Sequence, residues 1–74
     1  MRVFTDASGR RWDVVAGRES WGTLVALFVP SGWTGDILQT QLMASGYEVA
    51  EQELDRLDEE ELQAMLEKAR PRDG

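Results

Sequence analysis

The side chains that most often perform catalysis are missing from this chain of 74 residues. It contains no histidine and no cysteine, which removes Ser-His and Cys-His nucleophile pairs, histidine general bases and the usual zinc sites. The four serines stand in segments predicted to be turns or helix caps, where a hydroxyl commonly bonds the backbone. The composition therefore predicts a protein that is not an enzyme and that has no catalytic residue.

Carboxylates remain as possible metal ligands, and the densest group is Asp58 to Glu61. On a helix these side chains point in different directions around the axis, so they do not converge on one ion. No D-x-D-x-D-G calcium loop and no glycine-rich phosphate loop is present. Acidic residues at this place favour the start of a helix instead. The sequence predicts no metal site and no cofactor.

Aromatic and basic residues interleave at two places and are the strongest candidates for binding. Arg11 precedes Trp12, which we expect to be a core anchor, and Arg18 precedes Trp21. Trp33 stands in a glycine-flanked loop, where it either folds back over the core or forms an exposed anchor, since tryptophan is enriched at interface hot spots. The predicted partner-binding residues are Trp33, Trp21, Arg18 and Arg11.

The charge is unevenly distributed along the chain. Residues 1–46 hold four acidic and four basic residues, whereas residues 47–74 hold ten acidic and four basic ones, which accounts for the net charge of −6. A surplus of negative charge disfavours general binding to nucleic acid or to anionic membranes, because both are polyanions.

The stretch from Thr23 to Val29 is the longest apolar run and is rich in strand-forming residues. Both of its alternating faces are apolar, which is typical of a strand covered on both faces. Gly22 and Pro30 bound it. We predict that this stretch is the central strand of a small antiparallel sheet.

Further strands are predicted on either side of the central one. Residues 2–5 and 10–16 are strand-like and flank a turn at residues 6–9, which indicates a β-hairpin. Residues 37–44 are interpreted as a fourth strand because a loop of hairpin length precedes them; a helix is the alternative there, since Leu, Gln and Met favour helices.

The C-terminal part carries two helix signals. Ser45 and Glu48 fit a capping box, with Ser45 as N-cap. Asp58 is the predicted N-cap of a second helix, and Pro71 is expected to stop it.

These elements predict an α+β fold: a small antiparallel sheet of three to four strands, followed by two short C-terminal helices packed on one face. We expect a single domain over residues 1–70, with the sheet in residues 1–44 and the helices in residues 45–70. Residues 71–74 are expected to be a frayed tail.

The function predicted from these features is a small interaction or regulatory module with a protein partner, homodimeric through a sheet face or edge. One alternative is a single-stranded nucleic-acid binder that uses Trp12, Trp21 and the arginines. Another is an acidic mimic of nucleic acid formed by residues 47–70. The longest apolar run is far shorter than the roughly 20 residues that span a bilayer, so we expect a soluble, cytoplasmic protein without membrane contact.

Overall fold

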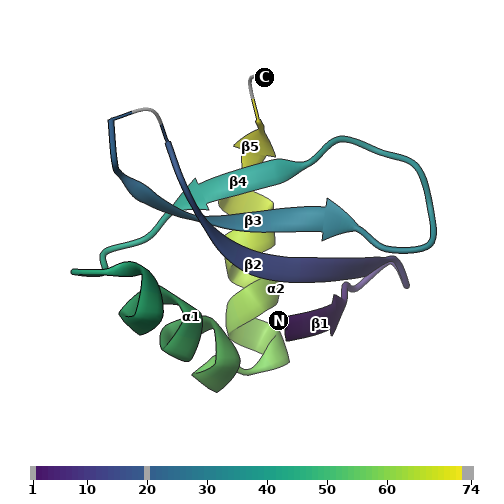
Figure 1. The fold of residues 1–74 in the computed structure, drawn as a ribbon. Coiled ribbons are helices and arrows are strands. Elements are labelled where there is room, and N and C mark those ends of the chain that lie inside the picture. The colour runs from purple at the N-terminus through teal and green to yellow at the C-terminus, as the bar shows by residue number, and fades with distance from the viewer. Residues whose placement is uncertain (1, 20, 73–74) are drawn as a thin grey trace.

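The computed structural model describes residues 2–19 and 21–72, which form one five-stranded antiparallel sheet and two helices (Figure 1). The elements are β1 (Arg2–Thr5), β2 (Arg11–Arg18), β3 (Leu24–Pro30), β4 (Leu38–Gln41), α1 (Tyr47–Arg56), α2 (Glu59–Lys68) and β5 (Arg70–Pro71). The strands lie side by side in the order of the chain, with β3 at the centre. The predicted α+β class is confirmed, and the sheet has five strands where three to four were expected.

The first hairpin places large side chains on one face of the sheet, which we call the inner face. β1 pairs with β2 so that Phe4 lies opposite Trp12, and β2 pairs with β3 so that Val14 lies opposite Phe28. Strand side chains alternate between faces, and the inner-facing residues of these strands are almost completely buried. They are Phe4, Trp12, Val14, Ala16, Leu24, Ala26 and Phe28.

Both helices cover this inner face. α1 contacts β2 and β3, whereas α2 contacts β4 and β1, and Figure 1 shows α2 passing behind the strands. Ala50 and Leu54 are one helical turn apart on α1 and are fully buried, as is Leu62 on α2. The apolar stripes of two amphipathic helices thus complete the core that the sheet begins.

The two helices start in different ways. Asp58 caps α2: its carboxylate accepts a hydrogen bond from the Glu61 amide, and the Glu61 side chain accepts one from the Asp58 amide. The cap predicted at Ser45 is wrong. The first helical bond of α1 runs from the Ala50 amide to the Gly46 carbonyl, so Gly46 is the N-cap. This helix start therefore has no hydrogen bond from a capping side chain.

The C-terminal segment extends the sheet, where a frayed tail was expected from residue 71. Pro71 pairs with Leu38 and Arg70 with Gln39, and the Arg72 amide donates a 2.8 Å bond to the Ile37 carbonyl. Residues 73 and 74 lie outside the described residues. Of the strand predicted over residues 37–44, the part Leu38–Gln41 forms β4, residues 37 and 42–44 are in neither a strand nor a helix, and the helix alternative is not observed.

The outer face of the sheet, opposite the helices, is partly shielded by the chain itself. Val25 faces outward yet is 1 % exposed, whereas Val3 on β1 is 46 % exposed. Gln39, which lies opposite Leu27 on β3, donates a 2.8 Å bond from its side-chain amide to the Glu19 carboxylate. The Arg72 guanidinium lies within 3.5 Å of the Gln39 side chain and of the Arg18 carbonyl. These polar side chains cover the β4 side of the outer face.

Candidate interaction surfaces

The turn between β1 and β2 is organised by one carboxylate, that of Asp6. Its Oδ1 accepts hydrogen bonds from the Ser8 amide, the Ser8 hydroxyl and the Arg10 amide, and its Oδ2 accepts one from Trp12 Nε1, all between 2.9 and 3.0 Å. Gly9 completes the turn at a φ of +87°, which a residue with a side chain rarely adopts. Asp6 therefore fixes both the Trp12 ring and the position at which Arg10 leaves the turn.

The hydrogen bonds to Asp6 also change its acidity. Burial alone would raise the pKa of this carboxyl, but the bonds donated by Trp12, Arg10 and Ser8 outweigh it and lower the pKa from 3.8 to about 2. Hydrogen bonds to the ionised form favour that form. Asp6 is therefore a charged structural group at neutral pH.

Trp33, in the loop between β3 and β4, folds back onto this turn. Its ring meets Trp12 edge to face at 4.8 Å between centroids, and its Nε1 donates a 2.6 Å bond to the Arg11 carbonyl. The Arg10 guanidinium lies 5.1 Å from the centre of the Trp33 ring, a cation–π distance. Gly35 lies so close to the ring that an added Cβ would be 2.3 Å from it. The folded-back alternative for Trp33 is the one observed.

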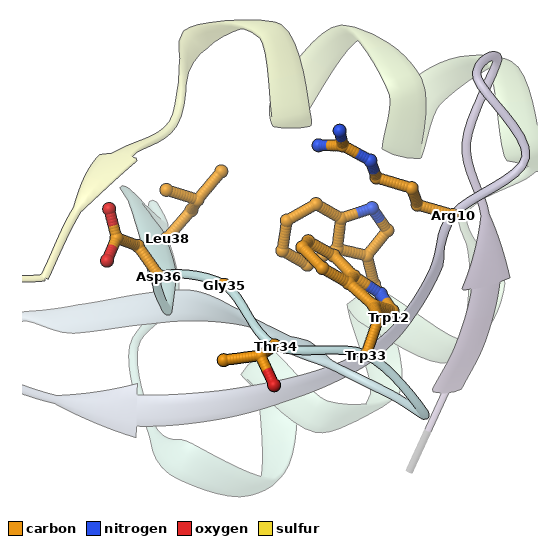
Figure 2. A pocket seen from close by; sticks show the side chains of 7 residues that line it. All are labelled: Arg10, Trp12, Trp33, Thr34, Gly35, Asp36 and Leu38. Atoms are coloured by element: carbon orange, nitrogen blue, oxygen red, sulfur yellow. The ribbon is translucent and has the colours of Figure 1, made fainter.

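These residues line an open hollow of about 450 Å³, which we call the Trp33 groove (Figure 2). It is lined by Arg10, Trp12, Trp33, Thr34, Gly35, Asp36 and Leu38. Figure 2 shows Arg10 and Asp36 on opposite sides of the two indoles. Both indole N–H groups already donate within the chain, so the tryptophans present hydrocarbon and aromatic surface to the groove. Polar recognition there is left to Arg10, Thr34 and Asp36.

Trp21 has the opposite environment. It lies in the hairpin tip that joins β2 to β3, and its side chain is 86 % exposed. The tip is closed by hydrogen bonds from the Glu19 amide to the Thr23 carbonyl and from the Gly22 amide to the Glu19 carbonyl, both 2.9 Å. Gly22 has a φ of +90°, which is costly for a residue with a side chain. The exposed indole thus stands on a hydrogen-bonded turn.

A second hollow of about 450 Å³, which we call the Met43 groove, lies between the end of β4 and the helices. Its apolar lining residues are Leu42, Met43, Leu57 and Met65, and its polar ones are Gln41, Glu53 and Arg56. Met43 is 92 % exposed. An unbranched thioether at the mouth can adapt to different contacting groups.

Charge is segregated between the two layers of the molecule. Residues 47–68, which include both helices, hold nine acidic and two basic residues, a net charge of −7. The rest of the chain holds five acidic and six basic residues, a net charge of +1. Cationic groups of a partner are therefore attracted to the helical layer, and the sheet layer is nearly neutral.

The four residues predicted to bind a partner fall at two separate places. Trp33 and Arg11 meet through the hydrogen bond described above, near the start of β2. Arg18 ends β2, and Trp21 follows in the hairpin tip, so this pair lies at the opposite end of the strand. Met43 is not predicted from the sequence, because a methionine beside apolar residues cannot be distinguished there from a core residue.

Within residues 2–19 and 21–72, no three carboxylates are grouped so that they could hold a metal ion. In the same part of the chain, no helix is long and apolar enough to cross a membrane. The chain matches no protein-family model, no curated protein and no solved structure.

Proposed function

We propose that this protein is a small non-enzymatic interaction module that binds a protein partner through the hairpin tip, with Trp21 as the anchor. The observation that carries the proposal is the 86 % exposure of Trp21 on a hydrogen-bonded turn. Burying a large apolar side chain contributes about 1.5–3 kcal/mol, and this contribution is unused in the isolated chain. A partner that covers the indole would gain it.

The geometry of the tip favours binding for a second reason. The turn is closed by the two backbone hydrogen bonds at Glu19 and by Gly22 at positive φ. These bonds restrain Glu19 and Gly22 before a partner binds, so less conformational entropy would be lost at those residues on association. The other exposed tryptophan surface, at Trp33, is already engaged with Trp12 and Arg10.

A single-stranded nucleic-acid binder is the second candidate, since an exposed Trp21 beside an exposed Arg18 could stack one base. Trp12 would not take part, because it is 4 % exposed and faces the helices. The third candidate is an acidic mimic of nucleic acid, and the net charge of −7 in residues 47–68 favours it. A salt-dependent shift of labelled single-stranded DNA or RNA would favour the second candidate over the first.

The proposal is tested by quantitative cross-linked capture from lysate of the source cells. Three baits are compared: the parent chain, Trp21→Ala, and Ile37→Ala, which shortens an exposed apolar side chain 40 % accessible and outside the tip. We expect one set of proteins to be retained by the parent and by Ile37→Ala and to be lost with Trp21→Ala, also after nuclease treatment. Equal capture by all three baits would contradict the role of Trp21.

A further inference from the structure

The end of the sheet that presents Trp21 also presents the Met43 groove. Val25 pairs with Gln41, and the Leu42 amide donates a 2.9 Å bond to the Leu24 carbonyl. The end of β4 therefore lies beside the start of β3, which directly follows the hairpin tip. One molecule thus presents the exposed Trp21 and the apolar Met43 groove at the same end of the sheet.

Trp21 does not fill the groove of its own chain. Its side chain is 86 % exposed, and none of its atoms lines the groove. The hydrogen bonds that close the tip hold its backbone in place. The Trp21 side chain and the Met43 groove are therefore both accessible to a second molecule.

We propose that two copies of the chain associate about a two-fold axis, with Trp21 of each copy seated in the Met43 groove of the other. This inference rests on the proposed role of Trp21 as an anchor and names a second copy as the partner. Because Trp21 and the Met43 groove lie at the same end of the sheet, one two-fold contact fills both grooves, and the assembly closes as a dimer.

The groove matches an indole in chemistry. Leu42, Leu57 and Met65 supply apolar walls, and the Met43 thioether can contact an aromatic ring favourably. A hollow of about 450 Å³ lies within the volume range of small-molecule sites in proteins. The indole would become a buried, centrally placed side chain of the kind that dominates interface energetics.

The charges at the rim match those of the tip. Glu53 and Arg56 line the groove from α1, and Arg18 precedes Trp21 at the end of β2, whereas the Glu19 carboxylate is bonded to Gln39. The exposed Arg18 at the tip is thus a basic counterpart to Glu53 at the groove, and in the proposed dimer Arg18 of one copy pairs with Glu53 of the other. Such pairing fixes orientation more than it adds affinity.

Sedimentation equilibrium over a wide concentration range tests the association. The parent chain is expected to be a dimer at high concentration, and Trp21→Ala to weaken dimerisation by at least about thirtyfold, the loss of a hot-spot side chain. Ile37→Ala should dimerise as the parent does. A parent chain that stays monomeric throughout would overturn the inference.

Charge reversal tests the pairing of tip and groove. Arg18→Glu and Glu53→Arg should each weaken the dimer by about tenfold, and the double variant should regain most of the loss. If the double variant regains no affinity, the pairing of Arg18 with Glu53 is contradicted. If the dimer persists unchanged in Arg18→Glu, Glu53→Arg, the double variant and Trp21→Ala, the interface lies elsewhere, such as on the outer sheet face. Should the parent be monomeric while Trp21→Ala loses a captured protein, only the dimer fails and the interaction module stands.

Discussion

At the scale of single residues, the three tryptophans of this protein lie in three different environments. Trp12 is a core residue tied to Asp6, and Trp33 closes over it with its indole N–H bonded to the Arg11 carbonyl. Trp21 alone places most of its ring in water. Because a binding contribution requires surface that is still exposed, the position of Trp21 decides where we place the interaction surface.

The sequence left two interpretations of Trp33 open, and physical reasons explain why. Flanking glycines allow both an exposed anchor and a ring that folds back. The outcome depends on the Arg11 carbonyl and the Trp12 ring, which come from a strand 21 to 22 residues away in the sequence. Such tertiary contacts leave no local pattern in the chain.

Substitution of Asp6 tests the hydrogen-bonded turn. Asp6→Ala removes all four acceptor contacts and is expected to lower the free energy of unfolding by about 2 kcal/mol. Asp6→Asn should lose less: one oxygen can still serve Ser8 and Arg10, but the amide nitrogen then faces the Trp12 N–H. Urea denaturation measures both losses. Parent-like stability of Asp6→Ala would contradict the importance of this turn.

Acid stability provides a separate test of the same carboxyl. Its pKa in the folded chain is about 2, below the ordinary value of 3.8, so the unfolded chain binds the proton more readily. Its contribution is therefore complete above the ordinary pKa and is lost as the pH falls toward 2. Urea midpoints measured across this window should fall less steeply for Asp6→Asn than for the parent. Identical pH profiles would show that Asp6 is not the group responsible.

At the scale of elements, the helix starts allow a matched comparison. Asp58→Ala removes the acceptor for the Glu61 amide and should cost about 0.5–2 kcal/mol, whereas Asp58→Asn should cost much less. Ser45→Ala should change little, because Ser45 caps no helix. Thermal melts of the three variants check this. A loss at Ser45 as large as that at Asp58 would mean that α1 begins one residue earlier.

The sequence predicted elements well where a pattern spans several residues. The alternation of Trp12, Val14 and Ala16 and the apolar run around Phe28 correspond to β2 and β3. β5 was missed because two residues carry no periodicity, and Pro71 is an ordinary helix stop. Pro71 pairs with Leu38 because the end of α2 lies beside β4, which is a tertiary arrangement. Elements held by tertiary position lie beyond local prediction.

At the scale of the whole molecule, the distribution of charge constrains how copies can meet. The helical layer carries a net charge of −7 and the sheet layer +1. Contacts in which two helical layers face each other broadly are therefore disfavoured by repulsion. The proposed contact involves only the end of the helical layer, where Arg56 accompanies Glu53, and the hairpin tip, where Arg18 accompanies Glu19.

Two-dimensional ¹H–¹⁵N NMR of the three indole N–H groups, recorded from low micromolar to millimolar protein, tests the central role of Trp21 most directly. The signals of Trp12 and Trp33 should stay constant, because both N–H groups are hydrogen-bonded within the chain. The Trp21 signal should move progressively as a second copy covers the ring. A Trp21 signal that keeps its position at every concentration, or movement confined to Trp12 and Trp33, would contradict the seating of Trp21 in a second copy.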